Sequence, residues 1–188
     1  MSAEFGVPVM PIPFELRPDM PEEGVSASGS GLSHPEHVEA QLLRQAREAG
    51  EPMVLPDHLP KTHLAILMAE VARDHGAAVH AAVHAAIYSA YFGEGRDIGD
   101  RTVLLGIALQ QGLQDAEVIA AWKADTYEER LRAFAQLALS LGVGTTPAAF
   151  ACSRLMLGTQ PYRVMREVMA QCARTTDDRT RAERARGV

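Results

Sequence analysis

Residues 141–160, LGVGTTPAAFACSRLMLGTQ, decide the fold of this chain. They contain two short apolar runs, Ala148–Cys152 and Leu155–Leu157, separated by a Ser-Arg pair. Two apolar runs joined by two residues predict a β-hairpin, although Ser-Arg is not a strong turn pair. Pro147 directly precedes the first run, a position where a missing backbone N–H does not disturb the strand. Its Thr-Pro bond is a candidate for a cis peptide, although most X-Pro bonds are trans.

Three stretches of the chain resemble one known family. The first is the stretch above, with the pattern Gly-Val-x-x-x-Pro, strand, turn, strand, Gly-x-Gln-Pro and a last helix. The second is PFELRPDMPEEG at residues 13–24, and the third is AIYSAYFGEGRDIGDRTVLLGIALQQGL at residues 86–113. In this order they resemble the FrnE-like branch of the DsbA superfamily, which is related to 2-hydroxychromene-2-carboxylate isomerases and kappa-class glutathione transferases.

The resemblance implies an α/β, thioredoxin-like fold with a large all-helical insertion, in a chain that is mostly helical overall. It also implies a division into four parts. These are a residual N-terminal strand of the thioredoxin-like domain in residues 1–24, a mostly helical insertion in 25–140, a C-terminal β-hairpin and helix in 141–173, and a tail in 174–188. We expect the tail to be disordered, because it is charged and nearly free of apolar residues.

Further elements are predicted from apolar spacing and from residues that start or stop helices. The segment Phe5–Ile12 reads as a short strand, which its three prolines restrict to an edge or irregular position. The predicted helices are His34–Ala49 with Ser33 as N-cap and Gly50 as stop, Pro60–His75, Ala78–Phe92, Asp100–Gln111, Asp115–Leu141 with a break near Asp125-Thr126, and Pro161–Ala173.

The resemblance assigns substrate binding to Thr146 and Pro147. In the family this proline is cis and faces the redox-active Cys-x-x-Cys motif across the active site. That motif lies on a helix that follows a first strand, and both precede the Pro-Phe-x-Leu segment. Here only 12 residues precede Pro13 and none is cysteine, whereas a βαβ unit takes about 30 residues or more. The N-terminal βα unit is therefore absent from the sequence, and we name no catalytic residue.

The absent strand would occupy the centre of a thioredoxin sheet, and its loss leaves unpaired backbone groups. We expect that the true protein begins further upstream, so that this chain is truncated. Two alternatives are that Phe5–Ile12 moves into the central position and that another chain fills it. Because a sheet edge invites pairing, a homodimer is one form of the last alternative.

The two cysteines, Cys152 and Cys172, lie 20 residues apart and form neither a Cys-x-x-Cys motif nor a zinc knuckle. Cys152 falls in a predicted core strand, and Cys172 near the end of the last predicted helix, where the helix dipole disfavours a thiolate. We predict that both are reduced, structural residues, since free cysteines are commonly buried. A Cys152–Cys172 disulfide is the alternative, and the cytoplasm disfavours it.

No metal or cofactor is predicted. His80 and His84 are four residues apart, but no third ligand stands at a telling distance, so half-buried helix histidines are the simpler interpretation. The acidic residues Glu94, Asp97 and Asp100 lack the spacing of a calcium loop. Asp100 is better explained as the N-cap of the helix that follows.

Composition limits the classes of partner. The chain has 188 residues, of which 47% are hydrophobic and 22% charged, and a net charge of −6. The negative charge argues mildly against nucleic acid and anionic membranes as partners. No apolar run approaches the roughly 18 residues of a spanning helix, and no secretory signal is visible, so we predict a cytoplasmic location.

The resemblance implies a thiol–disulfide oxidoreductase of the disulfide isomerase type, acting on protein or peptide thiols and disulfides. Because the Cys-x-x-Cys motif is absent, we predict that the 188 residues as given are redox-inactive, and we leave open whether the chain is an enzyme. The alternative is a redox-inactive thioredoxin-fold protein that binds a peptide or partner. A weaker alternative is a relative of the isomerases or glutathione-dependent transferases.

Overall fold

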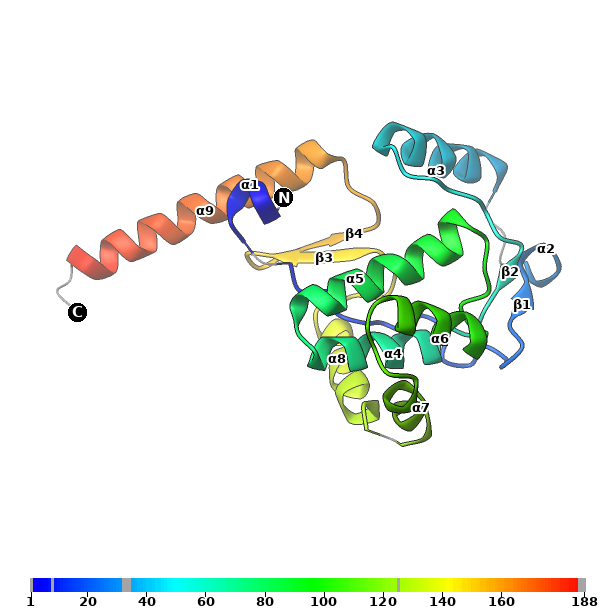
Figure 1. The fold of residues 1–188 in the computed structure, drawn as a ribbon. Coiled ribbons are helices and arrows are strands. Elements are labelled where there is room, and N and C mark those ends of the chain that lie inside the picture. The colour runs from blue at the N-terminus through cyan, green and yellow to red at the C-terminus, as the bar shows by residue number, and fades with distance from the viewer. Residues whose placement is uncertain (1, 8, 32–34, 125, 186–188) are drawn as a thin grey trace. The chain divides into compact units, whose positions relative to one another are not determined.

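Helices dominate the chain, as the apolar spacing predicts (Figure 1). The structure is a computed structural model, and it describes residues 2–7, 9–31, 35–124 and 126–185. The chain divides into two compact units. Unit 1 comprises Met1–Leu16 and Leu131–Val188, and unit 2 comprises Arg17–Arg130. We describe each unit by itself.

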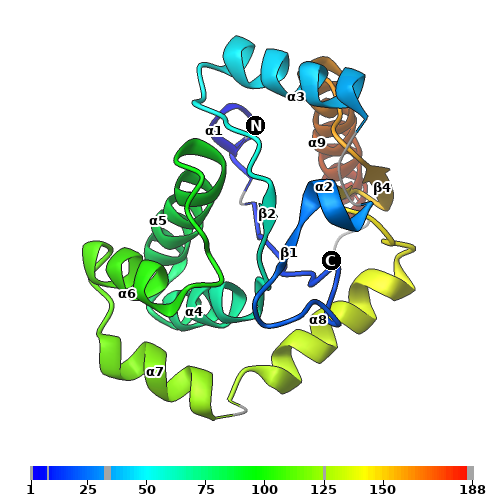
Figure 2. The same cartoon turned by 90° about the vertical axis from the view of Figure 1, so that its right-hand side faces the viewer.

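Unit 2 is a group of helices with one very small sheet (Figure 2). Its helical elements are α2 (Ala27–Ser30), α3 (Glu36–Ala49), α4 (His63–Asp74), α5 (Ala77–Tyr88), the π-helix η1 (Ser89–Gly93), α6 (Arg101–Gln110) and α7 (Asp115–Lys123). Strands β1 (Val25–Ser26) and β2 (His58–Leu59) pair antiparallel, with Val25 opposite Leu59. Helix α8 (Glu128–Ser140) begins in unit 2 and continues into unit 1.

The core of unit 2 forms where α4 packs against α5, α6 and α7. Met68 and Val71 of α4, Val83 of α5 and Leu104 of α6 are all fully buried. Because neighbouring helices cover α4 on several sides, most of its residues are buried rather than a single stripe. Burying one such side chain stabilises the fold by about 1.5–3 kcal/mol.

One carboxylate is fully buried in this core. Glu70 accepts hydrogen bonds of 2.9 and 3.0 Å from Nε of Arg73 and one of 3.2 Å from Arg130. Arg130 also donates to Asp74 at 2.9 Å, and so does the hydroxyl group of Tyr127. Burial, and then the hydrogen bond to Asp74, raise the pKa of Tyr127 to about 12. These bonds attach the beginning of α8 and the residue before it to α4.

Unit 1 contains α1 (Ser2–Phe5), the hairpin of β3 (Ala148–Ala151) and β4 (Arg154–Leu157), and α9 (Tyr162–Ala185) (Figure 1). Helix α9 contacts both β3 and α1. Glu4 of α1 accepts a hydrogen bond of 2.6 Å from Arg166 and another from Tyr162. The buried apolar residues of this unit are few. Those described are Ala138, Val143, Val168 and Cys172.

Local helix signals were predictive where a cap residue is well defined. Asp100 is the N-cap of α6, and its carboxylate accepts from the backbone N–H groups of Thr102 and Val103 at 2.6 and 3.2 Å. Gly50 adopts the left-handed conformation after α3, with φ 75°. The predicted break is confirmed, because α7 ends at Lys123 and α8 begins at Glu128. The predicted N-cap Ser33 lies outside the described residues.

Two predictions at the chain ends are wrong. The segment Phe5–Ile12 forms no strand in its described part, and Ser2–Phe5 is helical instead. Its prolines lack the N–H groups that a ladder needs. The last helix does not end at Ala173 but continues to Ala185. Arginine, alanine and glutamate are good helix formers, so a shortage of apolar residues here does not prevent helix formation. The division into four parts stays a prediction.

Candidate substrate-binding hairpin and its disulfide

The two predicted substrate-binding residues directly precede β3. Thr146 and Pro147 are both exposed, and the peptide bond between them is cis. The carbonyl group of Pro147 accepts a hydrogen bond of 2.8 Å from the backbone N–H of Gly158, so the hairpin pairing extends one step beyond the strands. This bond holds Pro147 at the open end of the hairpin.

The register of the hairpin determines which backbone groups face outward. The paired residues are Ala148 with Leu157, Ala149 with Met156, Phe150 with Leu155, and Ala151 with Arg154. In an antiparallel pair, hydrogen-bonded and non-hydrogen-bonded pairs alternate. Since Pro147 is bonded to Gly158, the pairs at Ala149 and Ala151 are the bonded ones. The N–H and C=O groups of Ala148 and Phe150 therefore point to the other edge of β3, and no strand in the described part of the chain pairs with that edge.

The same register places four apolar side chains on one face of the hairpin, because residues directly opposite share a face. They are Ala148, Phe150, Leu155 and Leu157. Phe150 is 53% exposed and Leu157 is 44% exposed. Large apolar side chains left open beside an unpaired strand edge are typical of a surface that another chain contacts.

The hairpin turn lies one residue earlier than the sequence predicted. Cys152 and Ser153 form it, and both are left-handed, with φ of 49° and 62°. Two left-handed residues in a two-residue loop are typical of a type I′ turn, which matches the twist of the strands. The prediction placed Ser153 and Arg154 in the turn because it counted cysteine as part of the apolar run. Asn-Gly, the usual signal of this turn, is absent here.

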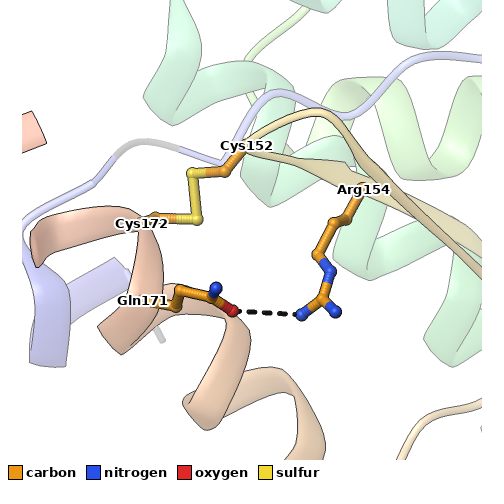
Figure 3. The surroundings of a disulfide bond; sticks show 4 residues. All are labelled: Cys152, Arg154, Gln171 and Cys172. Atoms are coloured by element: carbon orange, nitrogen blue, oxygen red, sulfur yellow. Dashed lines mark hydrogen bonds between the residues drawn. A yellow bond between two sulfur atoms is a disulfide. The ribbon is translucent and has the colours of Figure 1, made fainter. Parts of the chain in front are cut away.

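A disulfide joins the hairpin turn to α9 (Figure 3). Cys152 and Cys172 are bonded, with a Cα–Cα distance of 5.7 Å that lies in the usual range. The prediction of two reduced cysteines is therefore wrong, as is the placement of Cys152 in a core strand. That prediction rested on the usual burial of free cysteines and, against the disulfide, on the expected compartment, and it could not anticipate that the turn brings Cys152 against α9. The only sequence signal was that the chain has two cysteines, the number that one disulfide needs.

A hydrogen bond links the same two elements beside the disulfide. Arg154 donates from its guanidinium group to the side-chain oxygen of Gln171 at 3.2 Å, as Figure 3 shows. Arg154 follows Cys152 by two residues, and Gln171 directly precedes Cys172. This pair could not be identified from the sequence, because nothing in the order of residues places Arg154 next to α9.

His80 and His84 both lie on α5 in unit 2, with ring centroids 6.0 Å apart. His84 stacks on Tyr88 at 4.6 Å. Burial lowers the pKa of both histidines, and the charge of Arg73 lowers them further. Among the residues that the structure describes, no group of three or more histidines, cysteines, aspartates or glutamates could hold a metal ion.

No described helix is both long and apolar enough to cross a membrane.

The hairpin behind a cis-proline, the helical insertion and the final helix together define a thioredoxin-like fold of the DsbA type. A family model, the DSBA-like thioredoxin domain, matches residues 2–170, and the chain belongs to this family. The predicted DsbA-like, thioredoxin-type family and the fold class are thereby confirmed. A search of curated proteins gives no match.

Solved structures share this fold. A 2-hydroxychromene-2-carboxylate isomerase has a TM-score of 0.72 at 16% identity, over 94% of this chain and 87% of that one. A probable DsbA oxidoreductase from Streptomyces coelicolor has a TM-score of 0.79 at 24% identity, over 89% and 76%. The cytosolic disulfide reductase DsbM from Pseudomonas aeruginosa, solved with GSH, has a TM-score of 0.50 at 23% identity, over 85% and 82%. At these identities the similarity establishes the fold alone.

Proposed function

We propose that this chain binds an extended segment of a protein or peptide substrate along the free edge of β3, beside Thr146 and Pro147. The observation that carries the proposal is the pairing pattern of the hairpin, which turns the N–H and C=O groups of Ala148 and Phe150 outward. An extended peptide that pairs with these groups adds a strand to the sheet.

The side chains around this edge suit an extended ligand. In strand addition, backbone hydrogen bonds give affinity, and pockets for alternate side chains give specificity. Phe150 and Leu157 are exposed on one face of the hairpin and offer apolar contacts to such side chains. Thr146 and Pro147 are exposed at the start of the edge, where the end of the peptide would lie.

Substrate binding at this edge is common to both functions that the resemblance predicted. A DsbA-type oxidoreductase binds its protein substrate before thiol–disulfide exchange, and a redox-inactive relative binds without exchange. In this chain no Cys-x-x-Cys motif faces Pro147, so binding is the step that its own residues support. A cytoplasmic location and thiol-bearing protein substrates remain part of the proposal.

The experiment uses a labelled, extended peptide whose cysteines are alkylated, such as the carboxamidomethylated B chain of insulin. Because this probe has no free thiol or disulfide, its binding does not depend on any exchange chemistry. Fluorescence anisotropy gives the affinity, and hydrogen exchange gives the amides that become protected. We expect protection of the outward amides of Ala148 and Phe150.

A matched pair of variants isolates the backbone contact. Phe150→Ala removes the side chain and keeps the amide, whereas Phe150→Pro removes both without breaking an inner ladder bond. One net hydrogen bond is worth about 0.5–1.5 kcal/mol, so we expect Phe150→Pro to bind about three- to tenfold more weakly than Phe150→Ala. Equal affinities of the two variants would rule out pairing at this edge. If a second copy of the chain pairs with the same edge instead, the protein should sediment as a dimer. The substitution Phe150→Pro should then weaken this dimer.

A further inference from the structure

We infer that the Cys152–Cys172 disulfide is a reactive site, separate from the proposed binding edge, which exchanges with small anionic thiols. This site differs from the peptide edge of β3, because it lies at the opposite end of the hairpin, at the turn. The inference does not depend on peptide binding. It assigns to this chain an exchange chemistry of its own, on residues outside any Cys-x-x-Cys motif.

Access distinguishes the two sulfur-bearing residues. Cys152 is exposed at the tip of the hairpin, whereas Cys172 on α9 is only 7% exposed. A thiolate attacks a disulfide along a line through its two sulfur atoms, so the accessible sulfur is the one attacked. The small thiol therefore bonds to Cys152, and Cys172 is the leaving group.

A cation is held on the two elements that the disulfide joins. The guanidinium group of Arg154 donates a hydrogen bond to Gln171, which directly precedes Cys172 on α9 (Figure 3). This charge attracts an incoming thiol that carries a net negative charge. Arg154 is thus a positioning residue for the attack.

The exchange takes two steps and balances without a further reactant. The thiolate of the small thiol attacks Sγ of Cys152, a mixed disulfide forms, and the bond to Cys172 breaks and leaves a thiolate there. A second small thiolate then attacks the outer sulfur of the mixed disulfide and releases Cys152 as a thiolate. Both cysteine thiolates take protons from solvent. Two small thiols are oxidised to one disulfide, and the protein disulfide gains two electrons and two protons.

Opening the disulfide changes how α9 is held. In the oxidised chain the helix is tied to the hairpin turn by the disulfide and by the bond between Arg154 and Gln171. In the reduced chain the covalent tie is gone, and Val168 remains as a buried apolar side chain in the part of α9 whose side chains are described. The first turns of α9 keep their bonds to Glu4. In a reducing compartment, disulfides with such exposure are typically transient.

The test treats the full 188-residue chain, under native conditions, with glutathione at millimolar concentration. Free thiols are then alkylated, and the modified cysteines are located by mass spectrometry. We expect a glutathione adduct on Cys152 and an alkylated Cys172 in the same molecules. In the variant Cys172→Ser, treatment with oxidised glutathione should give an adduct that accumulates on Cys152. In the variant Cys152→Ser, Cys172 should react with oxidised glutathione much more slowly. A disulfide that yields only after the chain is unfolded would overturn the inference, and so would an adduct found mainly on Cys172.

The role of Arg154 is tested by comparing two small thiols. Glutathione is anionic at neutral pH and cysteamine is cationic, and the ratio of their exchange rates is measured in each variant. We expect Arg154→Gln to lower the glutathione-to-cysteamine ratio by about two- to fivefold, as expected for one exposed charge. The matched control Arg163→Gln removes another exposed arginine, from the first turn of α9, and should leave the ratio unchanged. An unchanged ratio in Arg154→Gln, or an equal loss in the control, would overturn this assignment.

Discussion

Unit 2 and unit 1 are held together by different means. The largest fully buried side chains, among them Met68, Leu104 and Val118, all belong to unit 2. Unit 1 contributes most of the large apolar side chains that remain exposed. Those of unit 1 are Val9, Met10, Ile12, Leu16, Leu137, Leu139, Phe150, Leu157 and Tyr162. Unit 2 is thus stabilised by apolar burial, whereas unit 1 depends on individual links.

The difference follows from what each unit has available to bury. In unit 2, the three helices α5, α6 and α7 pack against α4. In unit 1, the hairpin has only two strands, and a two-stranded hairpin is at best marginally stable by itself. Units with little core generally need covalent or polar links. Here these links are the disulfide to α9, the bond between Arg154 and Gln171, and the contacts of Glu4 with α9.

The strongest test of this comparison is a matched pair of leucine-to-alanine substitutions. Leu104 is fully buried in unit 2, whereas Leu157 in unit 1 is 44% exposed. A cavity at Leu104 should lower the free energy of unfolding of unit 2 by about 2–5 kcal/mol. Leu157→Ala should cost unit 1 less than about 1 kcal/mol, since little apolar area is lost from the buried state.

The two units can be followed separately during denaturant unfolding. Trp122 is the single tryptophan of the chain and lies in unit 2, where its indole N–H donates to the carbonyl of Leu64 at 3.0 Å. Its fluorescence reports on unit 2, and hydrogen exchange of β3 and β4 reports on unit 1. A larger cost at Leu157 than at Leu104 would contradict the assignment of the core to unit 2.

The buried histidine His80 makes the stability of unit 2 depend on pH. Burial lowers the pKa of His80 below 6.5, the charges of Arg73 and His84 lower it further, and the charge of Glu70 opposes them. The unfolded chain therefore takes up this proton at a higher pH than the folded chain. It follows that unit 2 loses stability as the pH falls below 6.5, and that the loss ends once the pH is below the folded pKa.

The pH effect should be smaller than that of the cavity at Leu104 and confined mainly to unit 2. Unfolding is measured through Trp122 at pH 7.5 and at pH 5.5. In His80→Gln the difference in the free energy of unfolding between pH 7.5 and pH 5.5 should shrink. Part of it should remain, because burial also lowers the pKa of His84. His37→Gln, which alters an exposed histidine on α3, is the matched control and should retain the full difference. If His80→Gln also retains the full difference in the free energy of unfolding, the role of His80 in the pH dependence is refuted.

Sequence reasoning succeeded where structure depends on near neighbours. The cap at Asp100 and the stop at Gly50 follow from hydrogen bonds and conformations within a few residues. The hairpin was predicted from its apolar runs, and the family resemblance supplied the thioredoxin-like fold. The outward edge of β3 was beyond prediction, because it depends on the register that the bond between Gly158 and Pro147 reveals.

The disulfide shows where such reasoning fails. A distance of 20 residues between two cysteines carries no information about their separation in space. The general expectation of reduced cytoplasmic cysteines filled that gap and was wrong for Cys152 and Cys172. A one-residue error in the turn compounded it, because a cysteine assigned to a core strand is not expected at an exposed hairpin tip. Both errors lie in unit 1, where few buried side chains constrain the interpretation.

The smallest expected effect concerns the turn of that hairpin. Ser153 is left-handed, with φ 62°, and an L-residue in this conformation costs about 1–2 kcal/mol relative to its favoured regions. Glycine adopts it freely but loses more entropy on folding. We therefore expect Ser153→Gly to stabilise the hairpin by about 0.5–1 kcal/mol, measured as slower hydrogen exchange in β3 and β4. Ser140→Gly, at the last residue of the helix α8, is the control and should be destabilising, because there glycine relieves no left-handed strain, adds entropy to the unfolded chain and removes the hydrogen bond from the Ser140 hydroxyl to the carbonyl of Leu137. If Ser153→Gly instead speeds exchange in the hairpin, the left-handed turn does not limit its stability, and the weakness of unit 1 lies in its missing core alone.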